Sequence, residues 1–395
     1  MSRILFITWD GPQTSYLEGL FLPIFKGLAE HGHRIHVLQF TWANAEIVLH
    51  TKAICESVGI PYQSAPVWRK AGSAGPFASA VLGRSCIRRA IRDWNIDTLM
   101  PRSLMPALAV LNLGYRRGLQ LVFDADGFAI DERVDFGRLS PESATYRILR
   151  TVEARTARVA DRVLVRTPRA IDILVDRSKT DRAKFHVVGN GRDPTPFLCG
   201  WPQRIDNEFR LCYAGSLGSQ YCPDQMIAVA QCLRFHIPNL VFRIFTGDKT
   251  NLDAALDQLG IYDRSWIEVS RLPPGDMPAA LMQCDLALAL RQPAFSTQGV
   301  APIKLGEYML AGLPVIGTEG VGLVDPLIES GVMFPLKEDL SQVWPWVRDN
   351  VIPHQNSLRK RAQALGLAHF SLKASVDSYL PALNTDIGAS PCQIF

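Results

Sequence analysis

The chain has 395 residues, of which 47% are hydrophobic and 20% are charged, and its formal net charge is +4. This composition excludes an intrinsically disordered chain, and no uncharged apolar run reaches the ~18 residues that a membrane-spanning helix needs. The length exceeds what one hydrophobic core usually serves, so two domains are expected.

The first half of the sequence alternates strand-like and helix-like segments. Short apolar runs predict strands at residues 3–9, 34–40, 98–103 and 120–127. Helical spacing of apolar residues appears between them, at residues 16–33, 79–95 and 106–118. Asp10 and Gly11 end the first apolar run too early for a secretory signal peptide, so we expect a strand there.

The second half repeats this alternation. The predicted strands are residues 209–216, 240–248, 266–271, 285–290 and 313–318. The predicted helices are residues 223–236, 251–260 and 277–284, one that begins at Pro302, and a helical tail. Strands that alternate with helices predict parallel sheets covered on both faces.

We therefore expect an α/β protein of two doubly wound, Rossmann-like domains that face a cleft. The N-terminal domain would span residues 1–195 and the C-terminal domain residues 196–370, joined where Gly, Pro and Asn concentrate. Residues 371–395 would form a C-terminal helix and tail, with the helix packing back on the N-terminal domain.

Charge is unevenly distributed between the halves. Residues 1–195 hold 27 Lys and Arg against 19 Asp and Glu, whereas residues 196–395 hold 15 against 19. A basic first half suggests an anionic partner. The eight cysteines include no C-x-x-C pair and no His/Cys cluster with zinc spacing, so we expect reduced thiols in a cytoplasmic protein.

The helix that begins at Pro302 has an unusual amino end. Proline is favoured at a first helical position, but Ala301 before it is a poor cap, so the next backbone N–H groups lack a side-chain partner. A phosphate would satisfy them. Lys304 lies in the first turn and Glu307 one turn further on the same side, where it could accept bonds from two sugar hydroxyls. The alternative is a solvated Lys304–Glu307 pair.

Two glycine-containing loops follow predicted strands. The loop at Gly215, Ser216 and Gly218 precedes a helix and offers backbone N–H groups to an anion, although turns also use glycine for conformational reasons. Gly11 follows the first strand without the G-x-G-x-x-G pattern of dinucleotide sites. It either lets the backbone approach a ligand or simply turns the chain.

These segments resemble a known family. Residues 209–326, with "YAGSLGSQY", "PIKLGEYMLAGLPVI" and "GVGLVD", are similar to the donor-binding half of retaining, nucleotide-sugar-dependent glycosyltransferases of the GT-B fold, in the "group 1" family 4. "VVGNGRD" and, in the first half, "FDADGFAIDERVDFG" extend the resemblance to most of the chain. It implies a sugar transfer from a nucleotide diphosphate sugar to a glycan or lipid-linked acceptor, in surface polysaccharide or glycoconjugate biosynthesis.

The resemblance also implies roles for individual residues. Glu307 matches the second glutamate of the family's E-x7-E motif, which binds the ribose, and Lys304 matches the diphosphate side. The remaining donor-binding positions implied by the resemblance are Gly11, Gly215, Ser216, Gly320, Val321 and Gly322.

The sequence departs from the family pattern at three places. Gly299 occupies the position of the first glutamate, so the usual donor-sugar contact is missing. The loop at Gly215 lacks the Arg and Lys of many relatives, and either Lys304, Arg271 or Arg291 substitutes or the two arginines are solvated surface charges. Asp126 occupies the region where the family often has His.

The expected mechanism needs neither a metal nor a cofactor. The amino end of the helix, Lys304 and the loop at Gly215 would stabilise the leaving diphosphate, and a phosphate oxygen would take the acceptor's proton. The Asp124–Asp126 segment has a D-x-D form but lies away from the expected diphosphate. Asp126 and Glu132 are assisting catalytic candidates, with loop capping or pairing with Arg133 as the alternative.

Two arginine series in the first half bear on a partner. The first is Arg84, Arg88 and Arg92, and the second is Arg147, Arg150, Arg155, Arg158, Arg162, Arg166 and Arg169. Basic helix faces attract anionic lipid surfaces, so peripheral membrane contact is one hypothesis and solvated helix faces are the other. No aromatic-interleaved basic motif indicates nucleic acid.

Three other functions remain open at this point. A nucleotide-sugar epimerase of the same fold would need no acceptor. A non-catalytic relative would bind nucleotide without turnover. The replacement of the first glutamate of the family motif by Gly299 allows this possibility. A two-domain ligand-binding protein of periplasmic type is disfavoured by the unpatterned cysteines. The base, the sugar, the acceptor and the oligomeric state are not fixed by the sequence.

Overall fold

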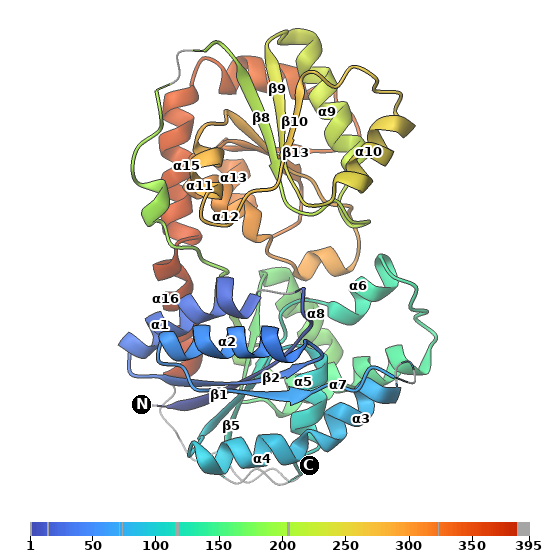
Figure 1. Cartoon of the computed structure of the whole chain (residues 1–395), viewed down its shortest axis with the longest axis vertical. Coiled ribbons are helices and arrows are strands. Elements are labelled where there is room, and N and C mark those ends of the chain that lie inside the picture. The colour runs from blue at the N-terminus through green and yellow to red at the C-terminus, as the bar shows by residue number, and fades with distance from the viewer. Residues whose placement is uncertain are drawn as a thin grey trace. The chain divides into compact units, whose positions relative to one another are not determined.

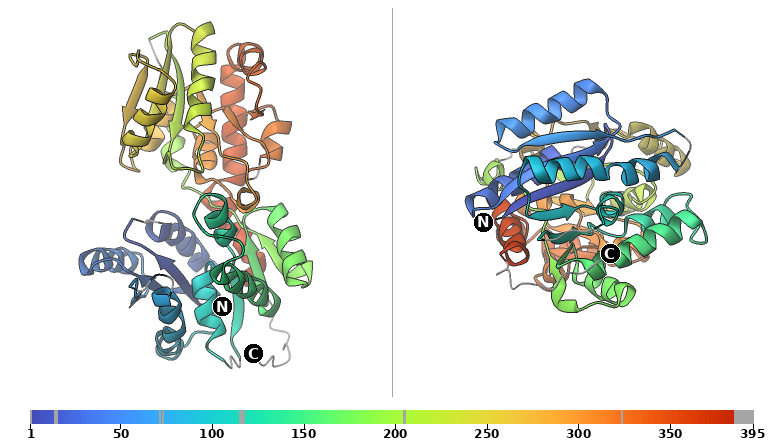
Figure 2. Two further views of the ribbon diagram at one scale, coloured as in Figure 1. Left: turned by 90° about the vertical axis from the view of Figure 1, so that its right-hand side faces the viewer. Right: turned by 90° about the horizontal axis from the view of Figure 1, so that it is seen from below.

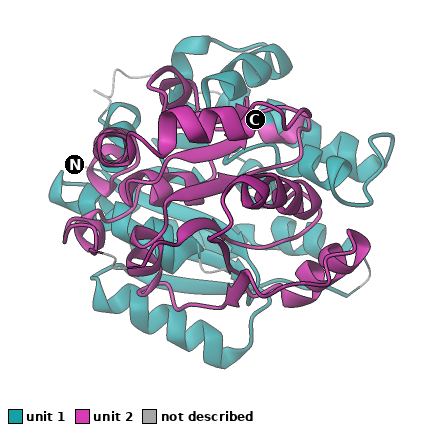
Figure 3. Ribbon diagram, turned by 90° about the horizontal axis from the view of Figure 1, so that it is seen from above, with its two compact units in different colours: residues 1–189, 298–300, 375–395 teal, residues 190–297, 301–374 magenta. Residues whose placement is uncertain are grey.

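The computed structural model describes residues 2–13, 16–70, 72, 74–114, 118–203, 206–322 and 324–384. The described chain divides into two compact units, shown in different colours in Figure 3. The N-terminal unit takes in the described residues of 1–189, 298–300 and 375–395, and the C-terminal unit takes in those of 190–297 and 301–374.

The N-terminal unit is built on a parallel sheet in the order β3-β2-β1-β4-β5-β6-β7. Its strands are β1 (Arg3–Asp10), β2 (Arg34–Thr41), β3 (Tyr62–Pro66), β4 (Thr98–Pro101), β5 (Gln120–Asp124), β6 (Arg162–Val165) and β7 (Phe185–Val187). The order of the strands reverses between β1 and β4, which makes that gap the switch point of the sheet.

Helices cover both faces of this sheet (Figures 1 and 2). They are α1 (Leu22–Glu30), α2 (Ala45–Ser57), α3 (Ala74–Leu82), α4 (Arg84–Asp93), α5 (Leu104–Leu111), α6 (Ala129–Asp135), α7 (Ala144–Val159) and α8 (Pro168–Ser178), with short helical turns at η1 (Leu17–Phe21) and η2 (Arg182–Lys184). The C-terminal helix α16 (Leu372–Leu383) joins this unit from Ser375 onward, as predicted. Ser378 Oγ there accepts a hydrogen bond from the Gly189 amide at 3.0 Å.

The C-terminal unit has a second parallel sheet in the order β10-β9-β8-β11-β12-β13. Its strands are β8 (Phe209–Ala214), β9 (Leu240–Phe245), β10 (Ile267–Ser270), β11 (Leu286–Ala289), β12 (Val315–Thr318) and β13 (Met333–Leu336). Its helices are α9 (Pro223–His236), α10 (Lys249–Gln258), α11 (Met277–Met282), α12 (Ile303–Leu310), α13 (Asp325–Glu329), α14 (Val343–Trp346) and α15 (Gln355–His369), with turns at η3 (Thr195–Phe197) and η5 (Val347–Val351). A further turn, η4 (Ser296–Gly299), leads into residues 298–300.

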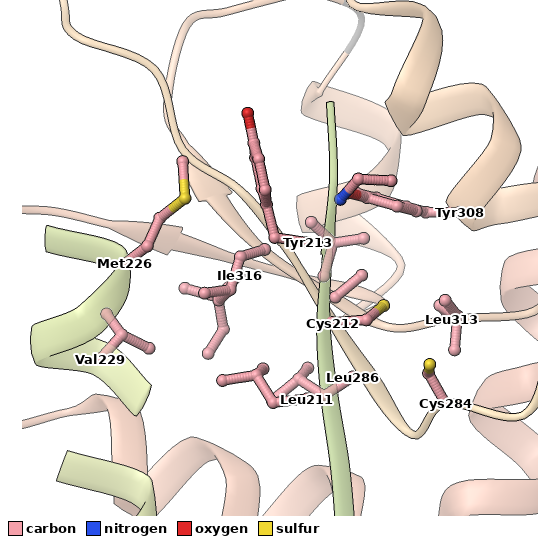
Figure 4. Packing of buried hydrophobic residues seen from close by; sticks show 14 of the residues in the cluster. Leu211, Cys212, Tyr213, Met226, Val229, Cys284, Leu286, Tyr308, Leu313 and Ile316 are labelled. Atoms are coloured by element: carbon pink, nitrogen blue, oxygen red, sulfur yellow. The ribbon is translucent and has the colours of Figure 1, made fainter. Parts of the chain in front are cut away.

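The core of the C-terminal unit lies between the sheet and its helices. Figure 4 shows Leu211, Leu286 and Ile316 packed together, while the hydroxyl of Tyr213 points away from these aliphatic side chains. Two doubly wound parallel sheets confirm the predicted fold class.

Two local predictions are wrong in detail. The helix expected from Pro302 begins at Ile303, because Pro302 has the extended ψ of 122° and occupies the N-cap position, with no side-chain cap. The helix expected over residues 106–118 ends at Leu111, and the chain turns at Gly114, whose φ is +76°. Residues 115–117 lie outside the described chain.

Within the described residues, no helix is long and apolar enough to cross a membrane. The seven cysteines of that part of the chain are free thiols, and Cys392 lies outside it.

Candidate functional site

The switch point of the C-terminal sheet lies between β8 and β11, where the strand order reverses. Ligands of open parallel sheets bind beyond the carboxyl ends of the strands at such a point. Two loops leave the sheet there: Gly215 follows β8 directly, and Arg291 follows β11 two residues after its end. The second loop leads to α12, whose first turn carries Lys304.

Lys304 contacts two aromatic rings, and the nearby Glu307 carboxylate only partly offsets the lowering of its pKa by burial. Its amine donates a hydrogen bond to Tyr213 Oη at 2.8 Å and lies 4.1 Å from the Tyr213 ring centroid and 4.3 Å from that of Tyr221. Burial, reinforced by the nearby positive charge of Arg291, lowers the pKa of Lys304 to about 7. A buried cation with so low a pKa favours an incoming anion, which restores the charged form.

Arg291 is a second cation beside Lys304. The residue is only 8% exposed, its guanidinium lies 5.4 Å from the Tyr221 ring centroid, and one Nη donates to Gln220. Its Nε has no hydrogen-bond partner, and the structure records no ion pair for it. Arg291 is therefore buried next to Lys304, whereas Arg271 is an exposed surface residue.

The glycine loop after β8 brings its backbone against Lys304. A Cβ atom placed on Gly215 would lie 2.7 Å from Lys304 Nζ, and the φ of Gly215 is +136°. Ser216 is exposed, and its carbonyl accepts the Tyr213 hydroxyl at 2.5 Å.

Two amides of this loop are already used within the protein. The Gly215 amide donates to Phe245 O at 3.0 Å and the Leu217 amide to Asp248 Oδ2 at 2.8 Å. The prediction of unpaired N–H groups is wrong for these two amides, because the β8–β9 ladder and an Asp side chain satisfy them. The groups on this side that an anion could still reach are the Lys304 amine and the start of α12, which has no side-chain cap.

Glu307 lies one turn after Lys304 on α12 but pairs with Arg192. Its Oε1 accepts from Arg192 Nε at 3.1 Å, and the Arg192 backbone is held by Phe370 O at 2.9 Å. Burial raises the pKa of Glu307, and Arg192 opposes that rise. The solvated Lys304–Glu307 pair is therefore not formed. Glu307 stays anchored, with a carboxylate that can accept hydroxyl groups.

The loop after β12 carries three further predicted donor-binding residues. Gly320 and Gly322 have φ of +74° and +89°, and the side chain of Val321 between them is buried. Thr318 at the end of β12 fixes the neighbouring loop, because its Oγ1 accepts from the Arg291 amide at 2.9 Å.

At the switch point of the N-terminal sheet, unlike that of the C-terminal sheet, the arginines are paired with carboxylates. Arg102, just after β4, pairs with Asp10 Oδ1 at 3.6 Å and with Asp126 Oδ2 at 2.5 Å. Arg166 pairs with Asp124 at 2.9 Å and with Asp126 at 3.4 Å. Burial alone would lower the pKa of Arg166, but Asp124 and Asp126 raise it above its ordinary value.

The remaining sequence-predicted residues of this unit have structural partners. Asp126 has a left-handed φ of +61° and is ion-paired to arginines other than Arg133. Glu132 lies in the first turn of α6 rather than in a loop. A Cβ on Gly11 would lie 2.4 Å from the Trp42 ring, so this glycine allows close packing of two loops. Both proposed assisting residues are in the N-terminal unit, and Lys304 is in the C-terminal unit.

Gly299 has a packing reason of its own. It belongs to the N-terminal unit, and a Cβ atom there would lie 2.8 Å from the Phe128 ring. Its neighbour Gln298 is held by Thr167 Oγ1, which donates to the Gln298 carbonyl at 2.6 Å. A glutamate at position 299 would not fit without displacing Phe128.

Sequence reasoning missed Tyr213, Tyr221 and Arg192, which surround Lys304 and Glu307, and the arginines that bind Asp126. A tyrosine near the end of a buried strand, two residues before the glycine of the following loop, is the pattern that identifies Tyr213. Among the described residues, no group of three or more His, Cys, Asp and Glu side chains has the geometry of a metal site.

Comparison with known proteins assigns the first half of the chain. Residues 21–191 match the family model described as "Glycosyl transferase 4-like domain". This matched segment, which lies almost wholly within the N-terminal unit, is similar to that family. No curated protein sequence matches the chain.

Solved structures similar to the chain extend this likeness beyond the glycosyl transferase 4-like domain. Anabaena HepE in complex with UDP-glucose has a TM-score of 0.67 at 16% identity, over 97% of this chain and 99% of HepE. WaaG, a glycosyltransferase involved in lipopolysaccharide biosynthesis, has a TM-score of 0.67 at 16% identity, over 97% and 100%. A putative UDP-N-acetylglucosamine 2-epimerase from Listeria monocytogenes has a TM-score of 0.61 at 16% identity, over 100% and 99%. Such identities show the fold, which is GT-B.

Proposed function

We propose that this chain transfers a sugar from a nucleotide diphosphate sugar to a saccharide or lipid-linked saccharide, with retention of the anomeric configuration. The observation that carries the proposal is the pair of cations, Lys304 and Arg291, at the switch point of the C-terminal sheet, neither of which forms an ion pair with a described residue. A bound diphosphate would supply a negatively charged partner for these two side chains. The UDP-glucose bound to HepE, a protein of the same fold, supports a donor of this class.

Each group has a separate task in the proposed donor site. Lys304 and Arg291 bind the diphosphate, so that Arg291 substitutes for the cations missing from the loop at Gly215. Glu307, held by Arg192, accepts the ribose hydroxyls. Backbone atoms of Gly215, Ser216, Gly320, Val321 and Gly322 line the donor, and Gly11 is a further proposed donor-binding residue.

The proposed reaction exchanges one bond at the sugar's anomeric carbon. The bond from that carbon to the diphosphate oxygen breaks, and a bond to the acceptor hydroxyl oxygen forms on the same face. The hydroxyl proton passes to the departing phosphate oxygen, so the step needs neither an enzyme base nor a metal. Lys304 stabilises the charge that develops on the leaving group. Asp126 and Glu132 assist by orienting the acceptor.

We further propose a setting for this activity. The protein would act in the cytoplasm in surface polysaccharide or glycoconjugate biosynthesis, in contact with the inner face of the membrane through its arginine-rich first half. The role of WaaG in lipopolysaccharide biosynthesis supports a pathway of this class.

A thermal-shift screen with nucleoside diphosphates and their sugar conjugates tests the donor site, because a bound ligand raises the melting temperature by mass action. We expect a stabilising member of the series with the native protein, and no shift with Lys304→Ala or Glu307→Ala. An unchanged shift in both variants would contradict the assignment.

Two alternatives keep specific support. The epimerase from Listeria favours a nucleotide-sugar epimerase, and product analysis with donor alone separates the two reactions. Gly299 favours a non-catalytic relative, because its contact with Phe128 leaves no space for the glutamate of the family motif. Nucleotide binding without turnover would identify that case.

A further inference from the structure

One segment of the N-terminal unit carries positive charge without any acid. Residues 57–92 contain no Asp or Glu, and their six cations are Arg69, Lys70, Arg84, Arg88, Arg89 and Arg92. The segment includes α3 and α4, which continue each other across Gly83 (Figure 1). The Gly83 amide donates to the Ser79 carbonyl at 2.8 Å, and the Ile87 amide donates to the Gly83 carbonyl at 3.1 Å, so Gly83 is hydrogen-bonded to both helices.

The same segment exposes large apolar side chains. Leu82 is 70% exposed and Trp68 is 55% exposed, and Val81 beside Leu82 is also exposed. The Trp68 amide donates to Ser79 Oγ at 2.8 Å, which fixes its loop to α3. Ser79 lies one helical turn before Leu82, so the loop and Leu82 are neighbours along α3. Exposed apolar groups of this size, held close together, indicate a contact surface.

The basic residues of α4 continue this surface. Ile87 and Ala90 form the buried face of the helix, and Arg84, Arg88, Arg89 and Arg92 are exposed. Arg92 pairs with the adjacent Asp93, whereas the structure records no ion pair for Arg84 or Arg89. We call Trp68, Val81, Leu82, Arg84 and Arg89 the α3–α4 surface.

A second basic region lacks these properties. A cavity of about 520 Å³ on α7 and α8 is lined by Arg150, Arg155, Arg158 and Arg177. Arg150 and Arg177 both pair with Glu153, and Arg158 Nε donates to the Ser178 carbonyl at 3.0 Å. Three of these four arginines therefore already form ion pairs or hydrogen bonds with other residues of the protein.

We propose that the α3–α4 surface docks on an anionic lipid bilayer, with Leu82, Val81 and Trp68 entering the headgroup region and Arg84 and Arg89 contacting lipid phosphates. A partner must accept the exposed apolar side chains of α3 and its preceding loop together with the cations of α4, and an anionic bilayer interface offers an environment for both. A soluble polyanion has no environment for Leu82. The proposal narrows the membrane contact suggested above to a defined segment, and it does not depend on sugar transfer.

Vesicle flotation tests this surface. The full-length protein is mixed with vesicles of phosphatidylcholine alone, or of phosphatidylcholine with phosphatidylglycerol, at physiological salt. We expect flotation with the anionic vesicles only. Removing two charges in Arg84→Gln/Arg89→Gln should weaken the partition coefficient about 30-fold, at roughly 1 kcal/mol per charge. The variant Trp68→Ser/Leu82→Ser should lose flotation while it keeps its arginines.

A matched control is available on α7. Arg147→Gln/Arg155→Gln removes the same charge from two exposed arginines for which no ion pair is recorded, and it should float like the native protein. Equal loss in this control, absence of flotation with anionic vesicles, or binding to heparin without binding to vesicles would each overturn the proposal. Thermal shifts with nucleoside diphosphates should be the same in all these variants, which separates failure of this surface from failure of the donor site.

Discussion

The two sheets place opposite electrostatic arrangements at equivalent points. At the switch point of the N-terminal sheet, Arg102 and Arg166 face the carboxylates of Asp10, Asp124 and Asp126, so the charges compensate one another within the protein. At the switch point of the C-terminal sheet, Lys304 and Arg291 form no ion pair with any described residue, and the charge of Glu307 only partly offsets the lowering of the Lys304 pKa.

This difference separates a cluster whose charges are paired within the protein from a candidate donor-binding site. Buried charges are costly unless they are paired, and a compensated cluster holds loops together. A buried pair of cations without an ion-pair partner, at the carboxyl ends of the strands, is retained at a cost in stability and is a candidate for ligand binding. The account therefore predicts that substitutions at the two points affect different properties.

The largest expected effect is on donor affinity in Lys304→Met. Loss of a charge-assisted hydrogen bond to phosphate should raise the Kd for the nucleotide donor about 10- to 100-fold. The free protein should melt at the same or a higher temperature, because a desolvated cation has been removed. Calorimetric titration and thermal melting measure both, with Arg271→Met as the exposed-cation control. Equal affinity in Lys304→Met and the control would break the comparison.

Gly215→Ala tests the close approach of the loop to Lys304. The φ of +136° disfavours alanine and its Cβ would contact the Lys304 amine, so we expect a loss of about 1–3 kcal/mol in the free energy of unfolding together with weaker donor binding. Gly218→Ala is the matched control, because nothing lies within 4 Å of its Cβ. Denaturant unfolding compares them, and equal stability of the two variants contradicts the proposed geometry.

Asp126→Asn addresses the N-terminal cluster. Asparagine tolerates the left-handed φ, so the variant removes charge without adding backbone strain. We expect a loss of about 1–2 kcal/mol in the free energy of unfolding, because Arg102 loses a charged partner, and an unchanged donor Kd. A donor Kd that rises as much as in Lys304→Met would mean that the two points do not differ in function.

The smallest expected effect is the pH dependence that Lys304 confers. Its pKa in the folded protein, about 7, lies below the ordinary value of 10.5. Between these values the unfolded chain binds more protons, so the stability contributed by this group rises with pH. The bound donor stabilises the charged form of the Lys304 amine. Above pH 7, the amine therefore takes up a proton when the donor binds, and the affinity for the donor falls as the pH rises. Calorimetry of a nucleotide sugar in two buffers at pH 8 should detect proton uptake in the native protein and not in Lys304→Met.

Much of the fold was predictable because both sheets have aliphatic central strands followed by helices with regular apolar spacing. Edge strand β3, whose sequence is YQSAP, has no apolar run and was not predicted. In the site, the positions of Lys304 and Glu307 on α12 followed from helical spacing alone. Their partners Tyr213 and Arg192 lie 91 and 115 residues away in the sequence, so those contacts depend on how the strands assemble.

The most direct test of the central claim is a crystal structure with a bound nucleoside diphosphate, from soaks with UDP, GDP, ADP and dTDP. The account predicts diphosphate oxygens within hydrogen-bonding distance of Lys304 Nζ and the Arg291 guanidinium, with the ribose at Glu307. A nucleotide bound elsewhere, or protein atoms filling the space between these two cations, would contradict it.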